Sequence, residues 1–513
     1  MKKVILIFVA FLATSLSAEA KVEEIVVVGA NVSYGYSDPE TDDSVIEAIE
    51  PIKIYTPGRL GGFAGATING TDTKHTSVYR NGIPVNDTGA GWYDFGTDLP
   101  MWQSYLIISG PNSVLFGSSS MAGTIIMEDD YFEKGIYLKG NIDQQMLLAG
   151  NTWLQLGRYG GTRGSVKTDN TEEDWYENNT LKTLTEWKGF KFNSVITDYK
   201  YDYDDCWSAD FINTDACQQE GLKMDSSIRK DWLTVGYSTS KTKHSSYGIQ
   251  TWKSDNDRYY IDVKEKFGDF LVGATYQKEV YNNLEDERPA IYSTWSKKDL
   301  SVGYRYEDGE HIGRLGLDMK GVKFSIGNSF RSPNLYERFG DDWVGANPNL
   351  KPEKGKGAEV SYNKFTAWRY DFDEGIDFDF ADYQYINSGE YTSQGIKYSN
   401  HIISNNGSWF LLAQYTDTDR IRVPKWQGKI SYYNVWNNID YMISYVGAYD
   451  KGLEFDGRTI DNMSTFNFNA GYYINKKYRI GLQVTDLLDR QFEILPGYSA
   501  GGREITISLD IST

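Results

Sequence analysis

The chain ends in the stretch EITISLDIST, residues Glu504–Thr513, in which apolar and polar residues alternate strictly. On a β-strand this places Ile505, Ile507, Leu509 and Ile511 on one face, and Thr506, Ser508, Asp510 and Ser512 on the other. The same alternation recurs in STFNFNAGYY (Ser464–Tyr473) and in GIDFDF (Gly375–Phe380). In GIDFDF we expect Asp377 and Asp379 on the inner face, which suits a water-filled lumen better than a dry core.

The composition of the 513 residues leaves two classes of β-protein open. Aromatic residues make up 15% of the chain, with 39 Tyr and 14 Trp, while the mean hydropathy is −0.52. Disordered chains lack aromatic residues, so disorder is excluded. A soluble all-β protein fits these values, and so does a transmembrane β-barrel with aromatic girdles and a polar lumen.

The first twenty residues, MKKVILIFVAFLATSLSAEA, favour export from the cytoplasm. Lys2 and Lys3 precede an apolar run, and small residues stand at Ala18 and Ala20, which predicts a signal peptide over residues 1–20. The run is too short for a spanning helix, and no later stretch has eighteen consecutive apolar residues. A secreted β-rich binding protein remains the alternative to a membrane barrel.

Turn signals divide the rest of the chain into two parts. The region before about Phe132 is rich in glycine and irregular, with a hairpin signal at Asn81-Gly82, and predicts a small mixed domain. From residue 133 to 513, tight turns alternate with long polar stretches such as Asp202–Asp225 and Glu337–Gly357. The tight turns are expected at Lys188-Gly189, Gly268-Asp269, Lys320-Gly321, Asn437-Asn438 and Asn475-Lys476. Short turns at one end and long loops at the other are typical of an outer-membrane barrel, which must close and is expected to have an even number of strands.

Charge and cysteines constrain binding partners. Cleavage after Ala20 would remove Lys2, Lys3 and Glu19, so the net charge would change from −19 to −20. Such an acidic chain does not fit nucleic-acid binding. Cys206 and Cys217 lie close together in an exported chain and are predicted to form a structural disulfide. Clustered acidic residues offer oxygen ligands of the kind that calcium prefers, although solvated acidic loops are the simpler and favoured explanation. These candidates are Asp169, Asp174, Asp202, Asp204, Asp205 and Asp210.

Three N-terminal motifs resemble TonB-dependent outer-membrane receptors. IISGPNSVLFGSSSMAGTIIM (Ile107–Met127) resembles the end of the plug domain of that family. TSVYRNGIPVND (Thr76–Asp87) resembles an earlier plug motif, with Asn81 in place of the usual acid. EEIVVVGA (Glu23–Ala30) resembles the TonB box, although a plain first strand of the plug would also explain it.

Three later motifs resemble the barrel of the same family, in family order. They are NSFRSPNLYERFG…NPNLKPEKGKGAEVSY (Asn328–Tyr362), YINSGEYTSQGIKYS (Tyr385–Ser399) and LQVTDLLDRQFEILPGYSAGGREITISL (Leu482–Leu509). The chain also departs from the family pattern. Asn69 stands in place of an arginine, Lys397 in place of a glutamate, and Thr513 in place of a terminal aromatic residue.

The resemblance implies the architecture and the task of this chain. It implies a closed, antiparallel, all-β transmembrane barrel of 22 strands over residues 133–513, with an α+β plug over residues 31–132 in its lumen. A TonB-box segment is expected over residues 21–30, where Glu24, Ile25, Val26, Val27, Val28 and Gly29 would pair with TonB. The implied location is the outer membrane of a Gram-negative bacterium, in contact with lipid and lipopolysaccharide, and the expected state is a monomer.

The implied function is active import of a scarce, bulky ligand such as a ferric siderophore, cobalamin or a similar metal chelate. A passive channel that is not coupled to TonB is the alternative, and no motif of an enzyme is present. Asp87, Trp92, Tyr93 and Trp343 are the expected ligand contacts, unless these rings only pack the plug against the wall. No cofactor is required, although cobalamin transporters of the family order their loops with calcium, which implies a structural Ca²⁺ in the extracellular loops.

Overall fold

The computed structural model describes most of the chain after residue 63. The described residues are 30, 32–37, 53–55, 64–99, 101, 103–129, 134–162, 174–203, 206–207, 213–214, 217–246, 249–341, 343–404, 407–450, 452, 459–490, 492–495, 498–499 and 502–512. The predicted signal peptide and the predicted TonB-box residues lie outside the described residues.

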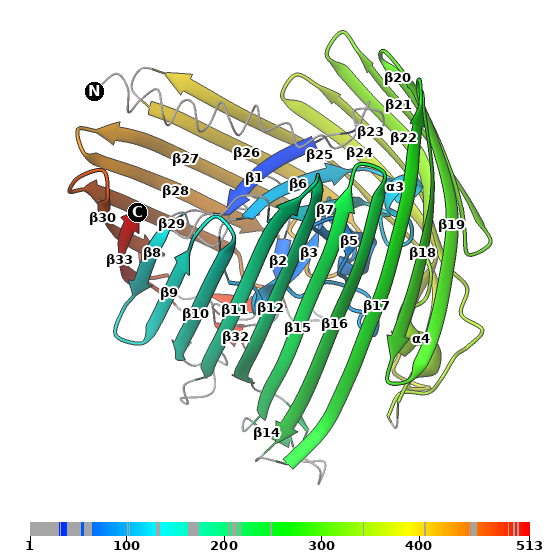
Figure 1. Cartoon of the computed structure of the whole chain (residues 1–513), viewed down its shortest axis with the longest axis horizontal. Coiled ribbons are helices and arrows are strands. Elements are labelled where there is room, and N and C mark those ends of the chain that lie inside the picture. Colours follow the sequence, from blue (N-terminus) through cyan, green and yellow to red (C-terminus); the bar gives the residue numbers. More distant parts are fainter. Residues whose placement is uncertain are drawn as a thin grey trace.

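A closed antiparallel barrel of 22 strands encloses a smaller sheet, as Figure 1 shows, and this confirms the expected fold class. The barrel strands are β8 (Gly135–Gly140), β9 (Gln144–Gly150), β10 (Leu154–Thr162), β11 (Trp175–Trp187), β12 (Phe190–Tyr203), β15 (Cys217–Lys230), β16 (Leu233–Ser246), β17 (Ile249–Phe267), β18 (Phe270–Tyr281), β19 (Leu284–Lys297), β20 (Leu300–Glu307), β21 (Glu310–Met319), β22 (Val322–Arg331), β23 (Glu353–Tyr362), β24 (Phe365–Asp379), β25 (Gln384–Ser404), β26 (Gly407–Thr418), β27 (Trp426–Trp436), β28 (Ile439–Tyr449), β29 (Met463–Tyr473), β30 (Tyr478–Thr485) and β33 (Glu504–Ser512). The last strand pairs with the first, with Leu509 opposite Leu138, so the wall has no open edge.

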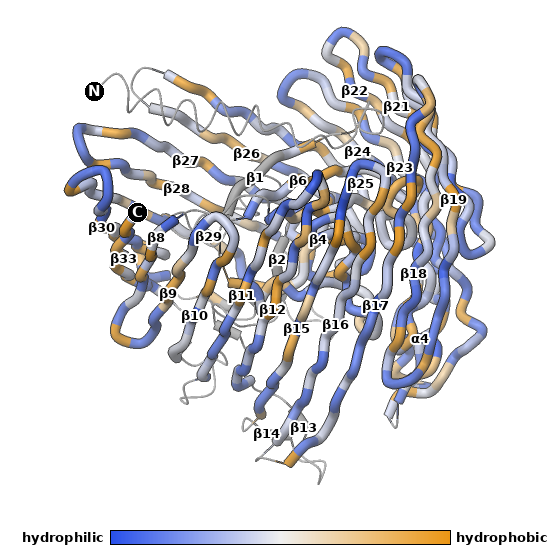
Figure 2. Tube along the Cα trace, in the orientation of Figure 1, coloured by the Kyte–Doolittle hydropathy of each residue, from blue (hydrophilic) through white to orange (hydrophobic). Residues whose placement is uncertain are grey.

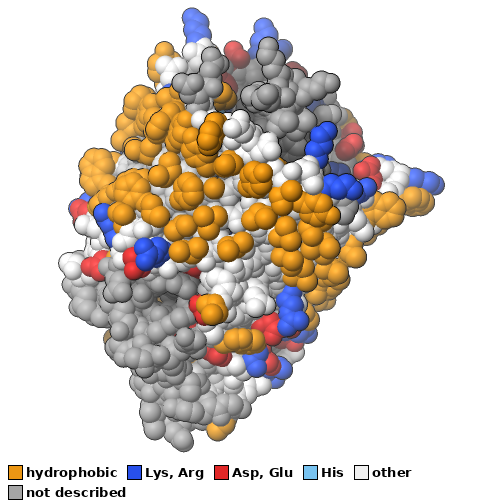
Figure 3. Space-filling model, turned by 90° about the vertical axis from the view of Figure 1, so that its left-hand side faces the viewer, with side chains coloured by type: hydrophobic (Ala, Val, Ile, Leu, Met, Phe, Trp, Pro, Cys, Tyr) orange, Lys and Arg blue, Asp and Glu red, His pale blue; other side chains and the backbone are white. Residues whose placement is uncertain are grey.

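The alternation of β33 runs in the expected direction, with apolar side chains pointing outward. Ile505 and Ile507 are 52% and 61% exposed, whereas Thr506 and Ser508 are 6% and 9% exposed. Figure 2 shows the alternating hydropathy along the strands, and Figure 3 shows apolar side chains gathered in a band across the outer face. Apolar side chains that face outward from a closed barrel are suited to contact with lipid.

One end of the barrel has only short connections among the described residues, whereas the other end carries all the long ones, together with two-residue turns at Asn282-Asn283 and Asp308-Gly309. Lys188 and Gly189 have φ values of 53° and 78°, and Lys320 and Gly321 have 53° and 79°, as a two-residue turn with positive φ at both central residues requires. Near this end Trp187 and Trp436 are 61% and 66% exposed, which is typical of an aromatic girdle at a membrane interface. The short-turn end is therefore the periplasmic end, and the long connections are extracellular.

The expectation for GIDFDF is wrong, because Ile376 and Phe378 face inward; Ile376 is 4% exposed, while Phe380, which follows the end of β24, is 66% exposed. The ring of Phe378 lies 5.2 Å from that of Tyr385, whose ring in turn lies 5.2 Å from Lys74 Nζ of the inner sheet domain. Asp377 belongs to the opposite face of β24, where Ser388 Oγ donates a hydrogen bond to it. The register shifts just before this stretch, between Phe372 and Gly375, and the stretch lies at the extracellular end. An irregularity of this kind changes the face to which the following side chains point.

The enclosed sheet has the strand order β1-β6-β7-β4-β5. Its strands are β1 (Val32–Ser37), β4 (Thr76–Arg80), β5 (Ile83–Pro84), β6 (Gln103–Ser109) and β7 (Gly123–Glu128). β4 and β7 are parallel, and the Asn81-Gly82 hairpin joins β4 to β5 as predicted. The minor elements are β2 (Lys53–Tyr55), β3 (Gly65–Thr67), η1 (Thr73–His75), η2 (Phe95–Thr97), α3 (Ser113–Phe116), β13 (Cys206–Trp207), β14 (Asn213–Thr214), α4 (Leu335–Phe339), β31 (Glu493–Leu495) and β32 (Tyr498–Ser499). In the described part of the chain, none of the helices has the length and apolarity of a membrane span.

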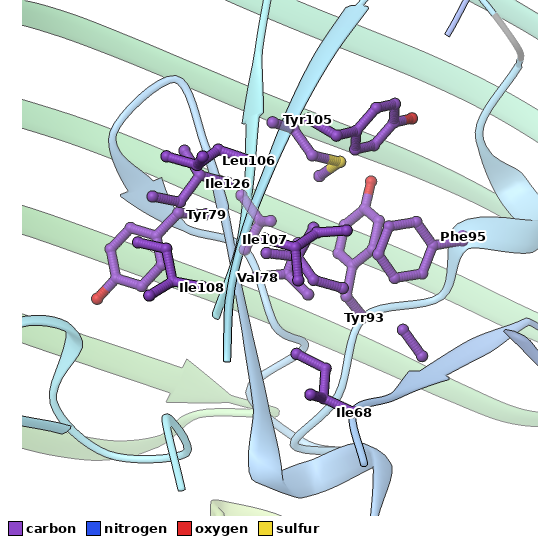
Figure 4. Close-up of a cluster of buried hydrophobic side chains, with 14 of the residues drawn as sticks. Ile68, Val78, Tyr79, Tyr93, Phe95, Tyr105, Leu106, Ile107, Ile108 and Ile126 are labelled. Carbon is purple, nitrogen blue, oxygen red and sulfur yellow. The ribbon is translucent and has the colours of Figure 1, made fainter. Parts of the chain in front are cut away.

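The enclosed domain, which we call the plug, has its own apolar core. Ile107, Ile108 and Ile126 of the central strands pack in it with Val78 and Phe95, as Figure 4 shows. A Cβ at Gly123 would lie 2.6 Å from Ile68 Cδ1 and 2.8 Å from the Ile108 carbonyl oxygen. Gly123, the last of the three glycines in the GPNSVLFGSSSMAG stretch, is therefore required by close packing where β7 begins.

Candidate functional site

The plug presents one loop to the extracellular side, and the barrel wall holds this loop in place. Asp87 Oδ1 accepts hydrogen bonds from the backbone N–H groups of Gly89 and Ala90, at 2.9 and 2.8 Å. Asp87 Oδ2 accepts a hydrogen bond from Asn256 Nδ2 on β17 at 2.8 Å. A Cβ at Gly89 would lie 2.5 Å from the ring of Tyr281, so a larger residue does not fit. Asp87 therefore shapes the loop, which we call the apex loop (residues 86–94), and fixes it to the wall.

The predicted ligand contacts Trp92, Tyr93 and Trp343 occupy different environments. Tyr93 is 4% exposed, and its hydroxyl donates to the carboxylate of Asp98, so its ring is part of the plug core. Trp92 is half-buried on the apex loop. Trp343 is 60% exposed in the loop after α4, where its N–H donates to Asp341 Oδ1 at 2.8 Å. Of the three rings, those of Trp92 and Trp343 are accessible to a ligand in this structure.

Sequence reasoning missed a row of aromatic rings along the extracellular mouth. Tyr336 of α4 lies between Tyr281 and Tyr385, with ring centroids 5.9 and 6.0 Å away. Phe378 continues the row at 5.2 Å from Tyr385, followed by Phe380 at 5.0 Å. These residues come from four separate elements, β18, α4, β24 with the residue after it, and β25, and only the closed barrel brings them together. The row offers flat apolar surface beside the apex loop.

Buried charged groups fasten the plug to the wall below the mouth. Lys74 Nζ lies 2.7 Å from Glu337 Oε1, and His75 Nε2 lies 2.7 Å from Glu353 Oε2. Arg331 joins the two carboxylates, with Nη1 at 2.8 Å from Glu337 and Nε at 2.7 Å from Glu353. Burial raises the pKa of Glu337, but Arg331 and Lys74 outweigh this effect and hold that pKa below its usual value. Glu337 also closes a capping box with Asn334, which fixes α4 above the plug.

Further ion pairs connect the plug to the strands between β11 and β15. Asp129 Oδ1 lies 2.6 Å from Lys182 Nζ, and both side chains are almost fully buried. Glu128 pairs with Arg229 at 2.7 Å. Arg80 Nη1 lies 3.2 Å from Asp225 Oδ2. A buried pair that loses one partner leaves an uncompensated charge, so these contacts resist displacement of the plug.

The position where the family pattern has an arginine is occupied by a neutral amide. Asn69 Nδ2 donates to Glu359 Oε1 at 2.9 Å and to the Tyr370 hydroxyl at 3.2 Å. Ser109 Oγ donates to the other oxygen of Glu359 at 2.8 Å. Lys397, the second departure from the pattern, is buried on the inner face of β25. Glu359 thus receives hydrogen bonds from the plug, but Asn69 brings no positive charge to it.

Acidification is expected to weaken the electrostatic attraction between Asp72 of the plug and Arg420 of the barrel. Burial raises the pKa of Asp72, but Arg420, His75 and Lys74 outweigh it and lower the pKa from 3.8 to about 2. Because the folded-state pKa is depressed, this stabilisation, about 2 kcal/mol, is present above pH 4 and is lost as the pH falls toward 2. Protease protection of the plug, measured against pH in detergent, should show this loss. The Asp72→Asn variant keeps the cap of η1 and should lack that part of the pH dependence, so identical pH profiles for both proteins would contradict the assignment.

Most of the predicted metal and disulfide residues lie outside the described residues. Asp174 is buried, and Asp202 accepts a hydrogen bond from Gln218 Nε2 at 2.9 Å, while Asp169, Asp204, Asp205 and Asp210 are not described. In the described part of the chain no three His, Cys, Asp or Glu side chains are grouped to hold a metal ion. Cys217 is disulfide-bonded, and since the side chain of Cys206 is not described, its pairing stays a prediction, as does calcium binding.

Comparisons with known proteins agree with this architecture. The family model described as "TonB dependent receptor-like, beta-barrel" matches residues 27–487. The siderophore receptor PirA from Acinetobacter baumannii is 12% identical, with a TM-score of 0.64 over 97% of each chain. A ferric enterobactin receptor (PfeA) from Pseudomonas aeruginosa, in complex with enterobactin, is 12% identical, with a TM-score of 0.67 over 94% of this chain and 99% of that one. The siderophore receptor PiuA from Acinetobacter baumannii is 13% identical, with a TM-score of 0.67 over 94% of this chain and 97% of that one.

A closed 22-stranded barrel with a plug domain in its lumen is the architecture of the plugged outer-membrane barrels. The family match then places the chain within that class: it belongs to the TonB-dependent receptors and lies in the outer membrane of a Gram-negative bacterium.

Proposed function

We propose that this receptor imports a ferric siderophore across the outer membrane, driven by TonB. The plug's attachment by buried ion pairs carries the proposal, because a barrel closed in this way needs work to open. Solved structures with the same fold include siderophore receptors, which favours an iron chelate over cobalamin. The passive channel is the alternative, and it would need an open path past these contacts.

The ligand would bind at the mouth, between the apex loop and the aromatic row. Trp92 and Trp343 would contact it directly, and Tyr336 and Phe380 would extend the apolar surface. Asp87 would act indirectly, by holding the apex loop against Asn256. The predicted segment Glu24–Gly29 would add a strand to a sheet edge of TonB and transmit the pull. Lipid and lipopolysaccharide would surround a monomeric barrel.

Uptake of radioactive iron tests this proposal. Cells that carry or lack the gene would receive catecholate, hydroxamate and carboxylate siderophores, haem and labelled cobalamin as separate sources. We expect one class of ferric siderophore to enter only with the gene, and uptake to stop when a protonophore removes the energy supply. Uptake that persists after the protonophore would favour the passive channel. Import of cobalamin alone would keep the energised mechanism and change the ligand.

A further inference from the structure

The short turns at the periplasmic end of the barrel, which we call the periplasmic rim, are rich in lysine. In these turns and the strand residues that flank them, lysine occurs eight times and aspartate three times. The lysines are Lys188, Lys230, Lys297, Lys298, Lys320, Lys364, Lys476 and Lys477. Because the whole chain has a net charge of −19, the periplasmic rim is opposite in sign to the rest of the protein.

The lysines of the periplasmic rim are not neutralised by carboxylates of the described chain. None of the eight forms an ion pair within the residues that the structure describes. At the extracellular end, by contrast, Lys241 lies 3.1 Å from Asp255 and Lys243 lies 3.2 Å from Glu220. These two lysine side chains are 52% and 61% exposed, so exposure alone does not prevent pairing. The cations of the periplasmic rim can therefore bind an anion from outside the chain.

Aromatic rings of the girdle hold two of these lysines side by side. Lys188 Nζ lies 4.6 Å from the centroid of the Trp187 ring, and Lys230 Nζ lies 4.6 Å from that of Phe190. Trp187 and Phe190 are direct partners in the ladder between β11 and β12. A Cβ at Gly189 would lie 4.0 Å from Lys230 Cε, so the turn after β11 adjoins Lys230. Cation–π attraction thus places two ammonium groups close together at the level of the girdle.

Lys230 lies on the lipid-facing side of the wall. Ile228 of the same strand is 39% exposed, and Lys230 follows it by two residues, so both belong to one face. Arg229 between them belongs to the inner face and pairs with Glu128 of the plug. Girdle tryptophans lie at the depth of the lipid headgroups. An ammonium group at this depth and on this face meets the phosphates of the leaflet next to the periplasm.

We propose that the periplasmic rim binds anionic phospholipid headgroups of the periplasmic leaflet, and that Lys188 and Lys230 form one of its binding sites. The phosphate of phosphatidylglycerol carries a negative charge that its glycerol does not offset, whereas the amine of phosphatidylethanolamine offsets its phosphate. Each basic residue near an anionic membrane surface strengthens binding about fivefold. The site is independent of ligand import, because it lies on the outer face of the wall.

Native mass spectrometry of the purified full chain tests the site. The chain is mixed in detergent with equal amounts of phosphatidylglycerol and phosphatidylethanolamine, and the ratio of the two bound lipids is measured. The native chain should prefer phosphatidylglycerol, and Lys188→Gln combined with Lys230→Gln should lower the ratio about tenfold. Arginine at both positions should keep the preference. The matched control, Lys241→Gln combined with Lys243→Gln, removes the same charge from the extracellular end and should leave the ratio unchanged.

The outcomes decide between the phospholipid and other partners. A ratio that falls in the Lys188 and Lys230 variant but not in the control supports the site. Equal binding of the two lipids by the native chain, or an equal fall in both variants, overturns it. Lysine-dependent sedimentation with peptidoglycan, at an unchanged lipid ratio, also overturns it. Gel mobility of unheated samples shows whether each barrel is folded, and if the glutamine variant is not, Lys297→Gln combined with Lys298→Gln decides.

Discussion

Deletion of Glu24–Gly29 is expected to reduce energised uptake to background while ligand binding at the cell surface stays unchanged. The segment would pair with TonB through its main chain, so its loss removes the connection to the energy supply and leaves the mouth intact. The measurement compares surface binding in the cold with uptake of radioactive iron in the warm. The deleted segment lies far from the apex loop in the sequence, and it ends before the first described strand of the plug, which begins at Val32.

Single substitutions in the same segment provide a matched control. Val26→Pro removes a backbone N–H and so a ladder hydrogen bond, whereas Val26→Ala keeps the N–H and shortens the side chain. We expect the proline variant to behave like the deletion and the alanine variant to keep most of the uptake. If all three proteins transport like the native chain, the segment is a plain strand of the plug, and the passive channel gives the better account.

Arg331→Gln is expected to destabilise the docked plug by about 3–5 kcal/mol, the usual effect of breaking a buried ion pair. Arg331 and both of its carboxylate partners are at most 2% exposed, so the carboxylates of Glu337 and Glu353 would lose their shared cation without access to water. A change of this size raises the undocked fraction about a hundredfold or more. The measurement is the urea concentration at which protease begins to cut the plug.

Arg369→Gln is the control for this variant. Arg369 pairs with Asp371 on the outer surface at 2.9 Å, and the two side chains are 59% and 47% exposed. An exposed pair contributes about 1 kcal/mol or less, so the urea midpoint should hardly move. Equal shifts in the two variants would mean that the buried cluster does not fasten the plug.

The sequence determined the architecture because membrane barrels follow local rules. Alternation along Glu504–Thr513 predicted which side chains of β33 face outward, since lipid selects apolar residues at every second position. Two-residue signals such as Lys188-Gly189 predicted the short turns because those turns need positive φ. Plug and barrel motifs in family order implied the 22 strands, which alternation alone could not count.

Local rules failed where several elements meet. Asp377 and Asp379 were assigned to the inner face, but the register shifts in β24 reversed the faces. Tyr93 was expected to contact the ligand or to pack the plug against the wall, but its hydroxyl donates to Asp98 and its ring joins the plug core. Neither the register shift in β24 nor the hydrogen bond from Tyr93 to Asp98 can be recognised in the local sequence.

Only the tertiary structure decided which buried polar and charged groups pair. His75 is isolated in the sequence, and its partner Glu353 lies 278 residues away, on a strand whose position depends on the closure and register of the whole barrel. The same holds for Asp129 with Lys182, which lie 53 residues apart in the sequence. Burial makes these pairs important for stability, because a charged group that is removed from water is costly unless another group compensates it. The position of the plug inside the closed barrel determines which group that is.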